Sequence, residues 1–418
     1  MKFGARVIHL RIKCILGLFG LLLGLYFSEV VLIVLAPYLR LRCMPFHCDK
    51  ASISSIILND RRQGNDIYPA IHPRQFMHAA VGNVGEKSIL PLGGISNVPT
   101  LLCNERGTPI RYQSGPFGFR NSDKQSLKSV DLLLLGDSFT QGFCVNEEAH
   151  FTGGMKESGY ALWNFASSGN GPLAEYATFR EYAVEFKPST TLWFFFEGND
   201  YEDFARELKN PILARYLQDK SFTQNLRGRQ PAVDALLRHF ADSQLQSYAN
   251  RGALKNWFVW SDIKRNTLEW LRLYNIRSRL GMANKTRAWR MEAEIAPYSM
   301  RHLTEELLFI IKEIEEVIAA WNGKLIFVYL PAWQRFSHGA VFRSHPEYKI
   351  LREKIIQRDI PFIDIAESFQ EHQDPLSLFP GRINLHYNEA GYHIITDKLS
   401  AYFSSSDTPH DSSGKDTV

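Results

Sequence analysis

Residues Val130 to Thr140, VDLLLLGDSFT, give the clearest indication of the fold, because a continuous apolar run stops at Gly136 and polar residues follow at once. Such a run is typical of a strand that is buried on both faces, as in a parallel sheet covered by helices. A serine between the end of this strand and the next helix lies at the edge where open α/β sheets build their sites. Taken alone, the Gly-Asp-Ser triplet is equally compatible with a turn that only caps a helix.

Short apolar runs of the same kind recur in the later sequence. Further short apolar runs predict strands at 191–196 (TLWFFF), 324–330 (KLIFVYL) and 360–365 (IPFIDI), and helical patterns lie between them at 173–186, 300–321 and 347–358. Strands that alternate with helices indicate an α/β domain with a parallel sheet. Residues 204–298 interrupt the alternation with helical periodicity and no obvious strand, so we interpret them as a helical insertion.

The N-terminus has the pattern of a membrane anchor. Residues 14–36 (CILGLFGLLLGLYFSEVVLIVLA) carry a single charge, Glu29. As a helix they would reach about 34 Å, enough to cross the hydrocarbon core of a bilayer. A cleaved signal peptide has a shorter apolar region of about 7–15 residues. The basic residues Lys2, Arg6, Arg11 and Lys13 precede the run. We therefore predict a cytoplasmic segment 1–13, a single-pass signal anchor 14–36 in the inner membrane, and an extracytoplasmic remainder.

Composition places the rest of the 418-residue chain among globular proteins, with 45% hydrophobic and 22% charged residues. The net charge of +4 equals the charge carried by the basic residues before residue 14, so the body is neutral, which argues against a nucleic-acid partner. Residues 37–127, rich in Gly, Pro and short apolar runs, predict a small irregular or β-rich lead-in. The polar tail 405–418 is expected to be disordered.

The cysteines outside the predicted span are Cys43, Cys48, Cys103 and Cys144, and an oxidising compartment would allow three pairings among them. The sequence does not choose between these pairings. It contains no CxxC pair and no glycine-rich nucleotide loop, so we expect neither a metal nor a cofactor.

Three further segments support the hypothesis of a functional site at Ser138. Ser168-Gly169-Asn170-Gly171 follows the short apolar run ALWNFA, and Gly198-Asn199-Asp200 ends the TLWFFFE run. His386 lies in NLHYNEAGYH, just before a C-terminal helical pattern. Serine, glycine, asparagine and histidine together supply what acyl transfer requires, namely a nucleophile, donors for an oxyanion, and a base.

These four segments, in this order, resemble the four blocks of the SGNH/GDSL hydrolase superfamily over roughly residues 128–404. Residues 115–121 (GPFGFRN) also resemble a segment found ahead of the serine block in membrane-anchored bacterial members. The resemblance implies a flavodoxin-like three-layer α/β/α domain with Ser138 as nucleophile and His386 as base. It also implies an oxyanion hole formed by the N–H groups of Ser138 and Gly169 and by the amide of Asn199.

One position departs from the superfamily pattern, which has an aspartate two or three residues before the histidine. Here those positions hold Asn384 and Ile383. Asn384 would orient the imidazole in a serine–histidine dyad, or a carboxylate from elsewhere would replace the aspartate, with the candidates Asp364, Asp374 and Glu389. A third reading is a slow enzyme or a binder without catalysis.

The resemblance implies a serine esterase that acts on ester groups, preferably O-acetyl groups, of an extracytoplasmic glycan or lipid. The alternatives are an O-acyltransferase of the cell envelope, which would use the same residues, and a non-catalytic glycan-binding module. The expected partners are the lipid bilayer, through residues 14–36, and an acylated carbohydrate or lipid ester.

Overall fold

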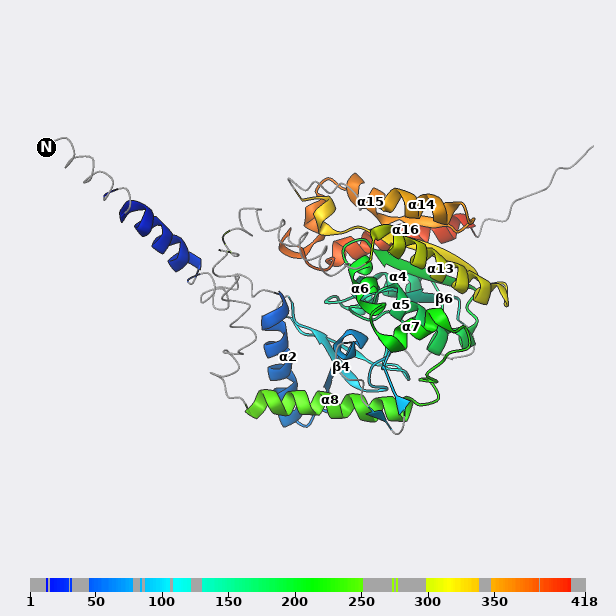
Figure 1. Cartoon of the computed structure of the whole chain (residues 1–418), viewed down its shortest axis with the longest axis horizontal. Helices are drawn as coiled ribbons and strands as arrows, with labels where there is room; N and C mark the ends of the chain where they lie inside the picture. Colours follow the sequence, from blue (N-terminus) through cyan, green and yellow to red (C-terminus); the bar gives the residue numbers. More distant parts are fainter. Residues whose placement is uncertain are drawn as a thin grey trace, which may run out of the picture. The chain divides into compact units, whose positions relative to one another are not determined.

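Figure 1 shows the protein as a computed structural model. It describes residues 13, 16–29, 31, 45–77, 83–84, 87–105, 108–121, 130–250, 273, 276, 298–337, 347–382 and 384–406. The chain divides into two compact units, one formed by Met1–Ser54 with Leu245–Met291 and the other by Ser55–Gln244 with Glu292–Val418. The second unit holds all the predicted site residues.

The predicted anchor 14–36 belongs to the first unit and is described only at residues 16–29 and 31. Within the described part of the chain, no helix is both long and apolar enough to cross a membrane. Most of the tail 405–418 lies outside the described residues.

A five-stranded parallel sheet forms the centre of the second unit, with the strand order β10-β9-β8-β6-β7. The strands are β6 (Leu132–Leu135), β7 (Leu162–Asn164), β8 (Thr190–Phe196), β9 (Lys324–Leu330) and β10 (Phe362–Asp364). Counted along the chain, this is the 2-1-3-4-5 order of flavodoxin-like folds, in which β6 and β8 flank the switch point. The predicted parallel α/β architecture is therefore confirmed.

Alternate side chains of each strand enter two separate apolar cores, because successive residues of a strand point to opposite faces. Leu133 and Phe195 belong to one core with residues of α5, α6, α13 and α14, and Leu134 and Phe194 belong to the other with residues of α4, α15 and α16. The sheet thus lies between two helical layers. The helices of these layers are α4 (Phe151–Glu157), α5 (Pro172–Thr178), α6 (Asp200–Glu207), α13 (Met300–Ala319), α14 (Tyr348–Ile356), α15 (Ile365–Glu371) and α16 (Glu389–Ser406).

The lead-in has more regular structure than the sequence analysis predicted. It contains α2 (Pro45–Arg62), β1 (Tyr68–Pro69), β2 (Asn83–Val84), β3 (Lys87–Ser88), β4 (Pro99–Cys103) and β5 (Ile110–Gln113). The irregular or β-rich interpretation is wrong for α2, where Ile53, Ile56 and Ile57 have the i, i+3, i+4 spacing of a helix. Strands β1, β4 and β5 form a three-stranded sheet, and β2 pairs with β3.

The lead-in packs directly on the α/β domain. Its side chains Leu90, Ile95, Phe117 and Phe119 belong to the same apolar core as the α5 face of the central sheet. The rings of Phe119 and Phe165 lie edge to face, with their centroids 5.0 Å apart. The lead-in is therefore in position to contribute side chains to the site.

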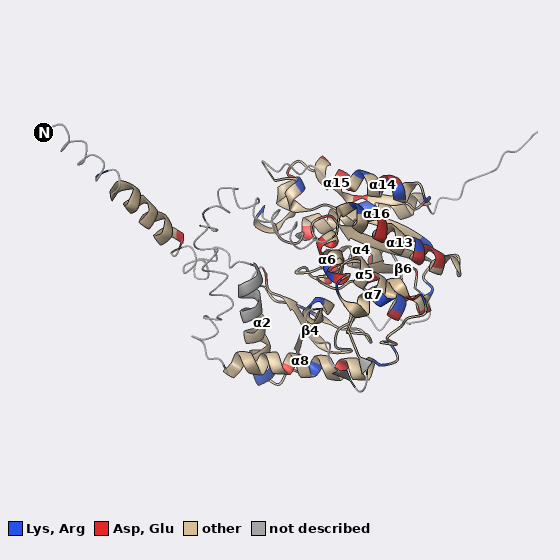
Figure 2. Ribbon diagram, viewed as in Figure 1, with Lys and Arg blue, Asp and Glu red and all other residues tan. Residues whose placement is uncertain are grey.

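The predicted helical insertion is described up to residue 250 and at residues 273, 276 and 298. Helices α7 (Pro211–Gln218) and α8 (Gln230–Asn250) occupy it, and Leu213 and Leu237 are buried in the α5-face core. Basic and acidic residues are interspersed along the described helices, as α13 and α14 show (Figure 2).

Candidate active site

The predicted nucleophile lies on a tight turn between β6 and the short helix α3 (Ser138–Gln141). Gly136 makes this turn possible, because a Cβ there would lie 2.2 Å from Oγ1 of Thr140. Asp137 caps the helix, since its Oδ1 accepts a hydrogen bond of 2.9 Å from the Phe139 N–H. Burial raises the pKa of Asp137 to about 6. Ser138 thus begins the helix at the carboxyl end of a central strand.

His386 meets Ser138 from the loop that precedes α16. Its Nε2 lies 2.9 Å from Oγ of Ser138, a hydrogen-bond distance across which the base can take the serine proton. The rings of Phe139 and Phe143 lie beside the imidazole, with centroids 4.8 and 4.6 Å from its own. The imidazole is therefore held between the nucleophile and two aromatic side chains.

The carboxylate that faces the other imidazole nitrogen comes from the lead-in. Nδ1 of His386 lies 3.2 Å from Oε1 and 3.4 Å from Oε2 of Glu105. The Glu105 side chain is only 8% exposed, so little water screens the pair. A proton on Nδ1, donated to Glu105, leaves Nε2 free to accept the proton of Ser138. Ser138, His386 and Glu105 have the connectivity of a catalytic triad.

This arrangement corrects the sequence predictions for the orienting group. Asn384 is exposed, and Glu389 is exposed in the first turn of α16. Asp364 caps α15 by accepting a hydrogen bond of 2.9 Å from the Ala366 N–H, and Asp374 forms an ion pair with Arg382. Glu105 occupies the position beside Nδ1 of His386 for which these four residues were candidates.

The predicted oxyanion donors lie in the loops that follow β7 and β8. Gly169 has φ +75°, a backbone conformation that favours glycine, and a Cβ there would lie 2.7 Å from Cδ of Arg74, which would have to shift. Asn199 precedes α6 and donates one hydrogen bond from Nδ2 to Oδ2 of Asp203. An amide nitrogen carries two hydrogens, so this bond orients the group and leaves one donor.

Buried acids that the sequence analysis did not identify hold these loops. Glu207 accepts hydrogen bonds of 2.6, 3.1 and 3.1 Å from the N–H groups of Gly171, Leu173 and Ala174, which caps α5 directly after the Gly169 loop. Burial raises the pKa of Glu207 to about 8. Asp203, which orients Asn199, is itself buried and lies 3.4 Å from Nη1 of Arg74.

The GPFGFRN segment supports the nucleophile turn. The buried guanidinium of Arg120 donates hydrogen bonds to the carbonyl groups of Gly142 (2.6 Å) and Val145 (2.9 Å), just beyond α3. The side chain of Asn121 exchanges two hydrogen bonds with the backbone of Asn164, whose own amide donates to the carbonyl of Thr140 at 2.7 Å. The segment thus links α3 to β7.

His150 predicts how stability depends on pH. It is 2% exposed, and burial, with Arg120 nearby, holds its pKa well below the ordinary value of 6.5. Below that pH the unfolded chain binds a proton that the folded protein does not, so the free energy of unfolding falls as the pH falls, by up to about 1.4 kcal/mol per pH unit. In His150→Gln residue 150 cannot titrate, so the change in the free energy of unfolding with pH should decrease by the amount that corresponds to about one bound proton. Urea unfolding between pH 5 and 7.5 measures it, and equal slopes for both proteins would contradict the assignment.

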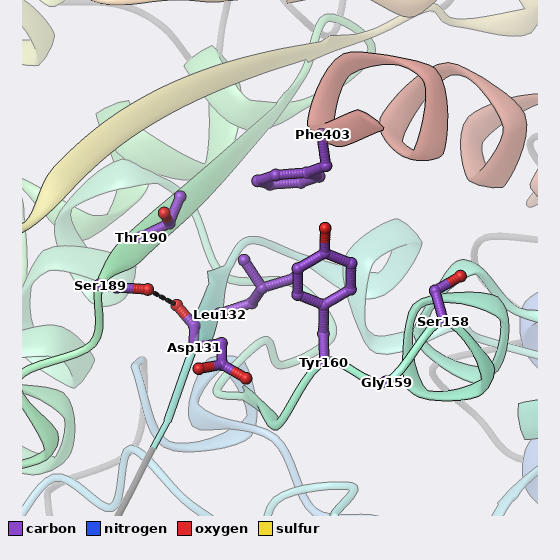
Figure 3. A pocket seen from close by; sticks show the side chains of 8 residues that line it. All are labelled: Asp131, Leu132, Ser158, Gly159, Tyr160, Ser189, Thr190 and Phe403. Carbon is purple, nitrogen blue, oxygen red and sulfur yellow. Dashed lines mark hydrogen bonds between the residues drawn. The ribbon is translucent and has the colours of Figure 1, made fainter. Parts of the chain in front are cut away.

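No group of three or more His, Cys, Asp or Glu side chains in the described ranges is arranged to hold a metal ion. A hollow of about 450 Å³ lies at the amino ends of β6 and β8, and Figure 3 shows the side chains that line it. It is lined by Asp131, Leu132, Ser158, Gly159, Tyr160, Ser189, Thr190 and Phe403. The triad lies at the opposite, carboxyl edge of the sheet, where ligands bind in this class of fold.

Fold and site together define an α/β protein in which a serine, a histidine and a carboxylate lie within hydrogen-bond distance of one another in turn. The chain is similar to several solved structures. An acetyl xylan esterase is 11% identical, with a TM-score of 0.35, and the match covers 65% of this chain and 99% of that one. A lipolytic protein of the G-D-S-L family from Veillonella parvula is 12% identical (TM-score 0.34; 66% and 99% covered). A lipase/acylhydrolase from Enterococcus faecalis is 11% identical (TM-score 0.34; 66% and 96% covered).

The likeness of the chain to these proteins is one of fold. No family model and no curated protein sequence matches the chain. Identities and TM-scores of this size do not identify a reaction, so the function has to be inferred from the geometry of the site.

Proposed function

We propose that this protein is a serine esterase. The observation that carries the proposal is the chain of contacts from Oγ of Ser138 to Nε2 of His386 (2.9 Å) and from Nδ1 of His386 to the carboxylate of Glu105 (3.2 Å). Ser138 attacks the ester carbonyl while His386 takes its proton, and the same proton then goes to the leaving alcohol. Water attacks the acyl-enzyme in the second half of the reaction, with His386 again acting as base.

The negative oxygen of each tetrahedral intermediate needs donors, and we propose three groups for this role. They are the N–H groups of Ser138 and Gly169 and the second N–H of the Asn199 amide. One such donor typically contributes about 3–4 kcal/mol to the transition state. The main argument for a non-catalytic module was that residue 384 is asparagine and not the usual aspartate. Glu105 places a carboxylate beside His386 instead.

We further propose that the acyl group is small, such as an acetyl ester on a glycan or lipid. Ser138 is only 7% exposed, and the imidazole that contacts it is flanked by the rings of Phe139 and Phe143. A short series of p-nitrophenyl esters tests this, with acetate expected to have the highest kcat/KM and the octanoate the lowest. A preference for the octanoate would contradict a small acyl pocket.

The domain is proposed to work outside the cytoplasm, anchored in the inner membrane by residues 14–36. The basic residues before the apolar run and the disulfide between Cys103 and Cys144 support this location, because stable disulfides form in oxidising compartments. A reporter enzyme that is active only outside the cytoplasm, fused after residue 418, should be active. Activity of a cytoplasm-only reporter at the same place would overturn the topology.

A fluorophosphonate probe tests the esterase proposal at the level of the nucleophile. We expect a single covalent adduct, mapped by peptide mass spectrometry to Ser138, because only an activated serine reacts with this probe. Heat-denatured protein should give no adduct, and Ser168→Ala, at a serine in the Gly169 loop, should give the same adduct as wild type. An adduct on another residue, or none, would refute the assignment of Ser138.

A further inference from the structure

The one disulfide among the described residues lies next to the proposed triad. It joins Cys103, the last residue of β4, to Cys144, which lies in the loop beyond α3, and the two Cα atoms are 5.6 Å apart. Both half-cystines are buried, Cys103 at 0% and Cys144 at 5% exposure. The bond therefore fastens the lead-in to the loop that follows the nucleophile.

Each end of the disulfide adjoins a residue that contacts His386. Glu105 comes two residues after Cys103, and its N–H donates a hydrogen bond of 3.4 Å to Sγ of Cys144. Phe143, directly before Cys144, lies against the imidazole with ring centroids 4.6 Å apart. Glu105 and Phe143 both contact His386, and each lies next to one end of the same disulfide.

Glu105 reaches His386 from a segment that is distant along the chain. It lies 281 residues before His386, in a segment outside the central sheet. A displacement of the β4 end by about 1 Å would lengthen the carboxylate–imidazole contact, and misplacement of this size can lower turnover about 100-fold. The disulfide and the Glu105 N–H bond to it resist that displacement.

We propose that the Cys103–Cys144 disulfide is a positioning element of the active site, which holds Glu105 against His386 so that the triad is complete only in the oxidised protein. This inference rests on the proposed esterase function. A dithiol reductant transfers two electrons and two protons to the disulfide and becomes a cyclic disulfide itself, which leaves two separate thiols. The esterase is then active in an oxidising compartment and impaired in a reducing one.

The test uses the full chain purified in detergent, with p-nitrophenyl acetate as substrate. For Cys103→Ser/Cys144→Ser we expect kcat to fall about 100-fold or more with little change in KM. The decisive readout is coupling: Glu105→Gln should cost far less in this background than in the oxidised wild type. A purely structural disulfide would leave the cost of Glu105→Gln unchanged. Cys43→Ser/Cys48→Ser, which removes the same number of thiols, is the matched control and should keep wild-type kcat.

Reduction of the wild-type protein by dithiothreitol covers the case in which the double variant does not fold. The disulfide state is followed by mass spectrometry and the fold by circular dichroism, and kcat should fall in step with loss of the disulfide. Unchanged kcat in folded, fully reduced protein would overturn the inference and leave the esterase function standing. An oxidised wild type without any esterase activity would instead refute the proposed function, and the inference with it.

Discussion

Replacing Glu105 with glutamine is expected to lower kcat for acetyl-ester hydrolysis by about 10⁴-fold, as the equivalent acid-to-amide change does in serine proteases. Glutamine has the same shape, but it does not offset the imidazolium charge, and it can present its amide nitrogen to Nδ1 and favour the wrong tautomer. KM should change little, because Glu105 contacts His386 and not the ester.

Two control variants separate this prediction from a general effect of lost charge. Asp374→Asn breaks an exposed ion pair with Arg382 and should change kcat by less than about 2-fold. Asn384→Asp restores the usual superfamily residue at an exposed position, and it should be neutral or harmful because Glu105 already faces the imidazole. A marked gain of activity in Asn384→Asp, or wild-type kcat in Glu105→Gln, would contradict the assignment of Glu105.

Replacing Ser138 with alanine is expected to remove nearly all turnover, on the order of 10⁶-fold in kcat, because no acyl-enzyme can form without the hydroxyl. The protein should still fold, since the turn depends on Gly136 and on the Asp137 cap, both of which remain. Initial rates at saturating ester, together with the midpoint of thermal unfolding, check both statements. A variant that is stable and keeps more than about 1% of kcat would show that another group attacks the ester.

The α/β domain could be predicted from sequence because its strands are short and apolar on both faces. VDLLLL and TLWFFF do not have the pattern of amphipathic elements. Strand β6 lies within the first run, and β8 covers the second together with Thr190. Helix α2 was missed because the apolar content of SISSIIL fits a strand as well as a helix. Only the spacing of Ile53, Ile56 and Ile57 indicates a helix.

The proposed nucleophile and base could be located from sequence because each lies in a motif directly beside a strand or helix of the α/β domain. Glu105 was not, because it lies in the lead-in, 281 residues before His386, and no motif marks it. The available signal was the cysteine pattern: a bond between Cys103 and Cys144 brings residue 105 next to the loop after Ser138. The sequence left three pairings open, so this signal was not usable.

The lead-in was also underestimated as a source of site residues. Arg74 lies against Gly169 and near Asp203, and Arg120 fixes the loop beyond α3. These contacts join residues that are distant in sequence, so they depend on tertiary packing that periodicity does not reveal. The shared apolar core of lead-in and α/β domain provides that packing.

Glu105 is proposed to act on the reaction through His386, and a double-mutant cycle measures the coupling between the two residues. kcat/KM for p-nitrophenyl acetate is measured for wild type, Glu105→Gln, His386→Ala and the double variant. If Glu105 acts only through the imidazole, its replacement costs about 10⁴-fold when His386 is present and less than about 2-fold when it is absent. Equal losses in the two backgrounds would show that Glu105 and His386 act independently and would contradict the triad.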